Sequence, residues 1–264
     1  MPPGSRRLSR FPFLACLFML LAGPVPVIAA DAPTVLITGA SRGIGLELAR
    51  QYAARGWHVI ATAREPTRAA ALQEIAAAHE RVQIEQLDVT DFATVDALAA
   101  KYRGKPIDIL LNNAGISGNV DVQVFGKLDY AVYDQVHAVN VLGPLKMAEA
   151  FVDNVAASDQ KKIISITSTQ GSITQTNGGN LFYRSSKASL NMVMRTLSLE
   201  LKKRGITVGL VSPGFVKTDF TRGIDLPIMI TPEQSAAAVI TVIDGYTLEQ
   251  AGTFMRHTGQ VAPW

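Results

Sequence analysis

The feature that most constrains this chain is a regular alternation of short β-branched runs with longer helical patterns, which begins at Thr34. The runs predicted as strands are residues 34–38, 58–63, 82–87, 107–111, 162–167, 207–211 and, at an edge, 252–255. The segments predicted as helices are residues 43–55, 67–78, 91–101, 129–157, 183–204 and 232–246. Strand–helix–strand repetition implies parallel strands joined by right-handed crossovers, with helices on both faces of the sheet. We therefore expect an α/β fold with a doubly wound parallel sheet of the Rossmann type, in a single domain over residues 31–264.

Residues 1–30 follow a different pattern. Arg6, Arg7 and Arg10 form a basic start, residues 11–21 form an apolar run, and small residues end the segment at Ala30. This is the pattern of a signal peptide, and the apolar run is short for a bilayer span. We expect export to the periplasm, and the arginine pair adds the hypothesis of twin-arginine export in the folded state. An uncleaved anchor at the membrane and a misassigned start, which would leave the protein cytoplasmic, are the alternatives.

Loss of this leader changes the charge and the thiol content. It removes three of the 25 basic residues and no acid, so the remaining 22 match the 22 acids and the net charge falls from +3 to zero. Such a balance does not favour nucleic-acid binding. Cys16, the only cysteine, leaves with the leader, so the mature chain can form no disulfide or cysteine metal site. The histidines lack metal-ligand spacing, and we expect no catalytic metal.

A glycine-rich turn, Thr-Gly-Ala-Ser-Arg-Gly-Ile-Gly, joins the first predicted strand to the first predicted helix. The tight turn needs Gly39, close approach of a pyrophosphate needs Gly43, and packing of the helix against the strand favours Gly45. The helix N-terminus then offers free N–H groups to the phosphates. The residues of this turn predicted to bind a dinucleotide are Gly39, Ser41, Arg42, Gly43, Ile44 and Gly45.

The end of the second predicted strand indicates which dinucleotide. An NAD site places an acid there to hold the ribose 2′-hydroxyl. Here the strand ends in Arg64, which with Arg42 could flank a 2′-phosphate while Ser41 donates a hydroxyl. NADP is therefore the expected cofactor. Glu65, one residue further, keeps NAD as the alternative.

Tyr183 and Lys187 are four residues apart in a predicted helix, so their side chains share one face. A nearby ammonium and a cationic nicotinamide favour the phenolate and would lower the pKa of the tyrosine. Such a phenol can exchange a proton near neutral pH. Ser168 ends a predicted strand and would point into the crevice where ligands bind, with Ser172 as the alternative.

These motifs occur in one order, and together they resemble the short-chain dehydrogenase/reductase family over nearly everything from Thr34 onward. The resemblance implies that Tyr183 is the general acid/base, that Lys187 holds the ribose, that Ser168 orients the carbonyl and that Asn140 holds a water. The cofactor residues that it adds are Asp88 and Val89 after the third strand, Asn113, Ala114 and Gly115 after the fourth, and Pro213, Gly214, Val216 and Thr218 near the nicotinamide amide.

The spacing from Ser168 to Tyr183 is longer than usual in this family, and with the Tyr-Arg-Ser-Ser-Lys motif it resembles a carbonyl-reductase-like branch that includes signalling factors of the C-factor type. The expected function is NADP(H)-dependent interconversion of a carbonyl and an alcohol. A nucleotide-binding signalling protein with incidental turnover is the alternative. Epimerase or dehydratase chemistry on nucleotide sugars would need a larger substrate domain.

An apolar loop between Pro213 and Thr231 suggests a lid over a small to medium apolar substrate, although the same residues could simply pack beneath the loop. The expected partner is thus a small molecule. No stable membrane partner is expected once the leader is cleaved, and a homo-oligomer stays open.

Overall fold

A computed structural model describes Met1, Gly4 and residues 32–264. The chain divides into two units, Met1–Asp31 and Ala32–Trp264, and the second holds all the helices and strands given below. Apart from Met1 and Gly4, the predicted signal peptide lies outside the described residues, and so does its cleavage site. Among the helices that are described, none is long and apolar enough to cross a membrane.

The second unit is built on one parallel sheet of seven strands in the order β3-β2-β1-β4-β5-β6-β7. The strands are β1 (Thr34–Ile37), β2 (His58–Ala63), β3 (Val82–Gln86), β4 (Ile109–Asn112), β5 (Lys162–Ile166), β6 (Thr207–Ser212) and β7 (Phe254–Arg256). Leu36 pairs with Ile60 on one side and with Leu110 on the other, which makes β1 a central strand. β1, β4, β5 and β6 consist mostly of buried residues, as expected of strands covered on both faces.

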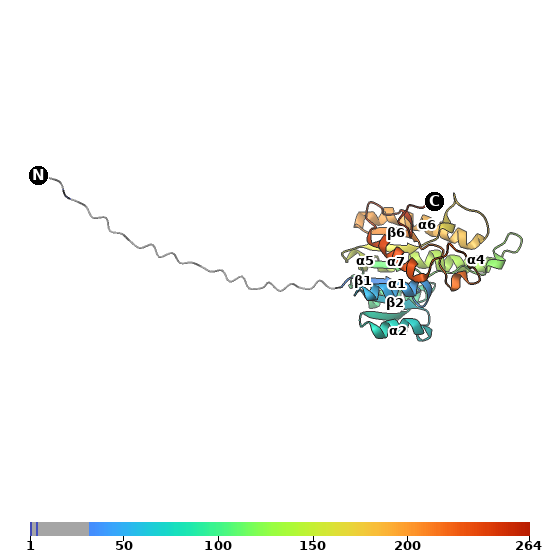
Figure 1. Ribbon diagram of the computed structural model, residues 1–264, viewed down its shortest axis with the longest axis horizontal. Helices are drawn as coiled ribbons and strands as arrows, with labels where there is room; N and C mark the ends of the chain where they lie inside the picture. The colour runs from blue at the N-terminus through green and yellow to red at the C-terminus, as the bar shows by residue number, and fades with distance from the viewer. Residues whose placement is uncertain (2–3, 5–31) are drawn as a thin grey trace. The chain divides into compact units, whose positions relative to one another are not determined.

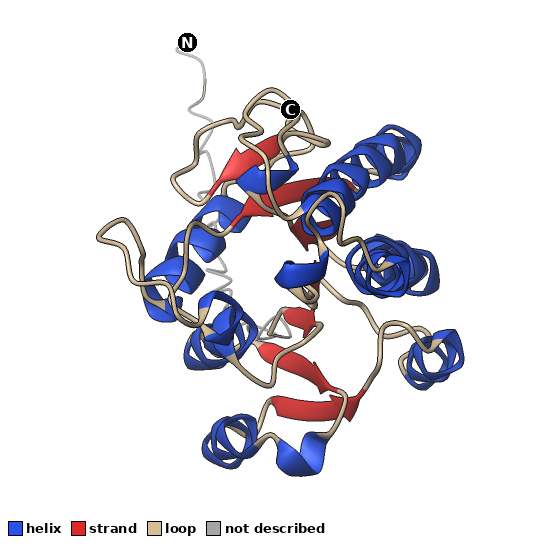
Figure 2. Ribbon diagram, turned by 90° about the vertical axis from the view of Figure 1, so that its right-hand side faces the viewer, coloured by secondary structure: helices blue, strands red, loops and turns tan. Residues whose placement is uncertain are grey.

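Seven α-helices are present in the described part of the chain, and they lie on both sides of the sheet (Figures 1 and 2). They are α1 (Gly43–Ala54), α2 (Ala70–Ala78), α3 (Phe92–Lys101), α4 (Tyr130–His137), α5 (Gly143–Ala156), α6 (Leu181–Leu201) and α7 (Pro232–Asp244). Polar caps explain several helix starts. Asp91 accepts hydrogen bonds from the first turn of α3, and Thr231 forms a capping box with Gln234 at α7.

Two hydrophobic cores fill the space between the layers. On one face, α1, α2 and α7 pack on the sheet around the fully buried Leu48, Leu72 and Val239. On the other face, α3, α5 and α6 pack around Val95, Phe151 and Met194. The predicted doubly wound α/β fold is confirmed by this arrangement, and it leaves the loops at the carboxyl ends of the strands free to build a site.

The order of the strands reverses between β1 and β4. The chain runs outward from β1 to β2 and β3, then returns to place β4 on the other side of β1. Ligands of such sheets bind in the crevice at this switch point, outside the carboxyl ends of the strands. The glycine turn after β1 and Asn113 after β4 both lie there.

The structure differs from the expected elements most clearly in the segment predicted as one helix over residues 129–157. A π-helical segment, η3 (Ala138–Leu142), separates α4 from α5. The wider π turn, a feature that is frequent at functional sites, carries the fully buried Asn140. Helical periodicity alone does not distinguish such a turn from a continuous helix.

The remaining differences lie at element ends. The predicted helix over residues 67–78 is a short 3₁₀ turn, η1 (Pro66–Arg68), followed by α2. The predicted edge strand over residues 252–255 is β7 (Phe254–Arg256). α6 begins at Leu181, two residues before the predicted start, because Asn180 in a left-handed conformation ends the preceding turn. Tyr183 is consequently in the first turn of its helix.

Candidate active site

The glycine turn after β1 is held tightly against the end of β4. Gly39 has a φ of +68°, and a Cβ added there would lie 2.9 Å from the Cα of Ala114. The side-chain amide of Asn113 donates to the carbonyl oxygens of Thr38 and Gly39, at 2.9 and 3.0 Å. A Cβ on Gly45 would overlap that same amide and the Gly39 carbonyl. The turn therefore admits only glycine at these two positions, and its backbone can approach a ligand closely.

A cavity of about 600 Å³ opens beside this turn, a typical volume for a small-molecule or cofactor site. Its walls come from the carboxyl ends of the central strands and from the loops that follow them. Of the predicted site residues in the described chain, those lining the cavity are Gly39, Ser41, Arg42, Gly43, Ile44, Gly45, Arg64, Asp88, Val89, Asn113, Ala114, Gly115, Ser168, Tyr183, Lys187, Pro213, Gly214, Val216 and Thr218. One cavity thus brings together residues from most of the length of the domain.

Arg64 and Glu65 are placed differently at the far end of this cavity. Arg64 lines the cavity, whereas Glu65 forms an ion pair with Arg68 at 2.8 Å and is absent from the described lining. Arg42 also lines it and lies 3.5 Å from the carboxylate of Asp219. Two cations therefore line the cavity, and a doubly wound fold would place a ribose or its phosphate near Arg64, which follows the end of β2.

Asp88 and Val89 complete that end of the cavity. The Asp88 carboxylate accepts hydrogen bonds from the backbone and the hydroxyl of Thr90, at 2.9 and 2.7 Å. These bonds fix the loop after β3, so that the carboxylate is held at the wall.

Tyr183 lies at the other end of the cavity. Its side chain is buried, and its ring packs edge-on against Phe220 at a centroid distance of 5.4 Å. Burial raises the pKa of Tyr183 to about 12, and a hydrogen bond with Ser168 opposes part of that rise. The expectation of a lowered pKa is not met in the protein alone, because removal from water outweighs the hydrogen bond with Ser168.

Lys187 follows one turn later on α6. Its Nζ donates to the carbonyl oxygen of Ile166 at 3.0 Å and lies 5.9 Å from the centre of the Tyr183 ring. Burial lowers the pKa of Lys187 from 10.5 to about 8. The predicted sharing of one helix face by the two side chains agrees with this geometry.

Ser168 and Ser172 were alternatives for the third polar group. Ser168 lines the cavity, and its hydroxyl also accepts a hydrogen bond from the backbone of Gln170 at 3.1 Å. Ser172 is buried against Thr174, with 3.3 Å between their hydroxyl oxygens, and does not belong to the described lining. The geometry therefore favours Ser168, which caps the 3₁₀ turn η4 (Thr169–Gly171) and faces the site at the same time.

Asn140 is the one predicted site residue in residues 32–264 that does not line the cavity. Its amide nitrogen donates to the Ile116 carbonyl and the Ser186 hydroxyl, both at 2.9 Å, and its oxygen accepts from the Ile116 backbone at 2.9 Å. Gly115 lies between it and Lys187: a Cβ there would be 3.3 Å from the Asn140 oxygen and 3.7 Å from the Lys187 nitrogen. Asn140 thus supports the wall next to Lys187, and its predicted water stays a prediction.

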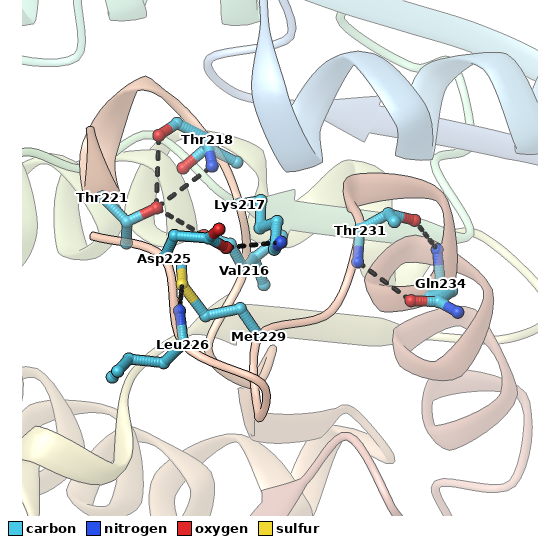
Figure 3. Close-up of polar contacts among 9 residues, drawn as sticks. All are labelled: Val216, Lys217, Thr218, Thr221, Asp225, Leu226, Met229, Thr231 and Gln234. Carbon is cyan, nitrogen blue, oxygen red and sulfur yellow. Dashed lines mark hydrogen bonds and ion pairs between the residues drawn. The ribbon is translucent and has the colours of Figure 1, made fainter. Parts of the chain in front are cut away.

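The predicted lid is a loop whose two ends are fixed together. Backbone hydrogen bonds join Lys217 to Ile230 and Ile230 to Phe215, each at 2.9 Å. Within the loop, Figure 3 shows the ion pair of Lys217 with Asp225 at 2.6 Å and the bonds around the Thr221 hydroxyl. The loop therefore holds its own conformation through internal contacts.

The apolar residues of this loop divide into three groups. Phe215 and Phe220 line the cavity, whereas Met229 is buried beneath the loop. Ile224, Leu226 and Ile228 are exposed. Met229 agrees with the expectation of packing beneath the loop, and the lid over an apolar substrate stays a prediction.

Sequence reasoning missed several residues that line the cavity. Ile116, Ser117 and Gly118 extend the segment after β4, and Gln170 extends the segment after β5. Their closeness to recognised motifs was the only available signal, since none of them carries a distinctive pattern.

Comparison with known proteins gives the family. The family described as short chain dehydrogenase matches residues 33–227 of this chain. A 1-hydroxy-2-glutathionyl-2-methyl-3-butene dehydrogenase from Rhodococcus sp. (strain AD45) is 37% identical over 237 residues, which cover 88% of this chain and 99% of that protein. The chain belongs to the short-chain dehydrogenase/reductase family, a family of oxidoreductases, as its motifs predicted.

Two further proteins show the range of the relatives. The NADPH-bound carbonyl reductase from chicken fatty liver superposes with a TM-score of 0.82 at 32% identity, covering 88% of this chain and 99% of that one. The C-signal of Myxococcus xanthus is 36% identical over 169 residues, which cover 64% of this chain and 99% of that protein.

The depressed pKa of Lys187 predicts that Lys187→Met stabilises the protein at pH 7, by on the order of 3 kcal/mol, because burying the ammonium costs free energy. Between the folded pKa of about 8 and the ordinary value of 10.5, the unfolded chain binds more protons at this residue, so the wild type regains stability as the pH rises. Urea denaturation at pH 7 and pH 10 measures the difference. A gap that widens with pH would contradict this account.

Proposed function

We propose that this protein is an NADP(H)-dependent oxidoreductase that interconverts a carbonyl and an alcohol. The observation that carries the proposal is the meeting of Tyr183, Lys187 and Ser168 in the same cavity as the glycine turn. A bound nicotinamide would supply or accept the hydride at carbon. The chain's own residues would then handle the proton at oxygen.

The proton transfer follows from the state of each group. With a pKa of about 12, Tyr183 is a neutral phenol at pH 7 and can donate its proton to a carbonyl oxygen that gains charge. The Ser168 hydroxyl faces the same space and can orient that oxygen. Lys187, with a pKa of about 8, is mostly protonated at pH 7 and stabilises the resulting phenolate. Reduction of a carbonyl suits this set of protonation states.

The preference for NADP rests on the charges at the far end of the cavity. Arg64 and Arg42 line the cavity, while Glu65 is engaged with Arg68 and is absent from the described lining. An arginine can bind a 2′-phosphate with two charge-assisted hydrogen bonds, and an acid in its place would repel it. The similar carbonyl reductase from chicken fatty liver is described with bound NADPH.

The substrate is proposed to be small to medium in size and apolar. Phe215, Phe220 and Ile116 line the cavity, and the ring of Phe220 packs against that of Tyr183. The carbonyl oxygen would then be the one polar group of the substrate that the protein recognises, and Tyr183 and Ser168 can bind it.

A second candidate function is signalling with incidental turnover, and the similarity to the C-signal of Myxococcus xanthus is what favours it. A pure nucleotide-binding protein has no need for a buried tyrosine and lysine at the substrate end. Their presence favours catalysis as the main function.

Tyr183→Phe is expected to lower kcat for a panel of small apolar aldehydes and ketones at least about 100-fold, because the proton donor is lost. Binding of NADPH, followed by fluorescence, is expected to change less than twofold, since the ring is kept. Full turnover in this variant would refute the catalytic assignment. Retained biological activity without turnover would support the signalling function.

Arg64→Ala is expected to raise the Kd for NADPH about 10- to 100-fold and to leave the Kd for NADH unchanged, because one charge-assisted contact to the 2′-phosphate is lost. Arg68→Ala is the matched control, since Arg68 pairs with Glu65 away from the cavity. Titration calorimetry with both nucleotides measures the effect. Equal weakening of NADPH and NADH binding would remove Arg64 from the phosphate site.

We also propose that the protein is exported and that the leader is cleaved after Ala30. Mass spectrometry of the native protein from fractionated cells is expected to find a periplasmic chain that begins at Asp31. An intact N-terminus in the membrane fraction would indicate an anchor. A chain confined to the cytoplasm would contradict export.

A further inference from the structure

Gln123 is a fully buried glutamine outside every motif named above. It directly follows the short 3₁₀ turn η2 (Val120–Val122) in the loop between β4 and α4. Its amide nitrogen donates to the carbonyl oxygens of Ser117 and Asn119, at 2.6 and 3.2 Å. Its amide oxygen accepts from the backbone N–H of Tyr183 at 3.0 Å. Two carbonyl partners and one N–H partner fix the orientation of the amide, because only nitrogen can donate and only oxygen can accept.

The bond to Tyr183 meets a need that α6 does not satisfy itself. The first backbone N–H groups of a helix have no partner within the helix. Asn180, the residue before α6, has left-handed dihedral angles and gives no side-chain cap among the described bonds. Gln123 therefore caps α6 from a distant segment, at the residue that carries the phenol.

The other two hydrogen bonds of Gln123, to Ser117 and Asn119, join it to the turn that lines the same cavity as Tyr183. Ser117 and Gly118 line the cavity together with Tyr183. A Cβ on Gly118 would lie 2.7 Å from Val136 and 3.1 Å from the Gln123 amide nitrogen, so this turn is packed closely around Gln123. One side chain thus connects the backbone of Tyr183 to the turn beside it.

We propose that Gln123 is a positioning residue, which sets the place of Tyr183 relative to the Ser117–Asn119 turn through its three hydrogen bonds. It is not among the residues that line the cavity, and it acts through Tyr183. The expected effect on turnover rests on the proposed function. The cap that Gln123 provides at the start of α6 does not depend on that function.

The test uses Gln123→Met, which keeps the length of the side chain and removes all three bonds. We expect kcat for benzaldehyde reduction to fall about 10- to 100-fold, since a small misplacement of a catalytic group has effects of this size. The KM for benzaldehyde and the Kd for NADPH are expected to stay within about twofold, because the cofactor end is untouched.

Asn154→Leu is the matched control. Asn154 is also a buried amide held between backbone carbonyls, donating to Tyr102 and Lys105 at 2.6 and 2.8 Å, and it lies on α5 away from the cavity lining. Both variants are expected to lose stability, and only Gln123→Met is expected to lose kcat. Unchanged kcat in Gln123→Met, or an equal loss in Asn154→Leu, would overturn the proposal.

Hydrogen exchange of the Tyr183 amide separates this proposal from the proposed function. Slow exchange in the wild type that becomes fast in Gln123→Met, with no change in Asn154→Leu, supports the cap even if Tyr183→Phe retains turnover and the catalytic assignment fails. Fast exchange of the Tyr183 amide in the wild type would overturn the proposal. This measurement needs no variant, so it remains decisive if Gln123→Met does not fold.

Discussion

The close approach of β1 and β4 at the point where the strand order reverses is the constraint on which the site depends. The hydroxyl of Thr38 accepts from the backbone N–H groups of Asn113 and Ala114, each at 3.0 Å, and the Asn113 amide returns two bonds to the glycine turn. These contacts hold the loop after β1 and the loop after β4 so close that their backbones are in contact. A dinucleotide can bind there because its pyrophosphate must approach the backbone closely, and bulky side chains would prevent that.

Burial shifts the pKa values of Tyr183 and Lys187 in opposite directions, and these shifts set the protonation states at the substrate end of the cavity. The same removal from water raises the pKa of Tyr183 and lowers the pKa of Lys187. The two values move apart, from 10.0 and 10.5 to about 12 and about 8, so the phenol holds its proton more firmly and the ammonium holds its proton less firmly. No ion pair within the described structure offsets this burial at Lys187, whose neighbour is the carbonyl of Ile166.

The sequence was sufficient for the sheet, the glycine turn and the Tyr183–Lys187 pair, because each rests on a local pattern with a direct physical cause. Strand runs, glycines with forced dihedral angles and an i, i+4 spacing can all be found without tertiary contacts. Asn140 was found through family resemblance, yet its π turn was not, since the turn is set by bonds to Ile116 and Ser186. Gln123 was missed altogether, because its partner on α6, the backbone N–H of Tyr183, is 60 residues away in sequence.

The pinned ends of the loop between Phe215 and Ile230 have a consequence for how specificity can evolve. The loop closes on itself through main-chain bonds, so its interior can change in length or composition while the strand and helix that flank it keep their places. The predicted cofactor residues Val216 and Thr218 stand near one pinned end of this loop, so substrate preference can change at later positions while these two residues stay in place. Variation of the inner residues of this loop would allow related enzymes to acquire new substrates while the glycine turn stays unchanged.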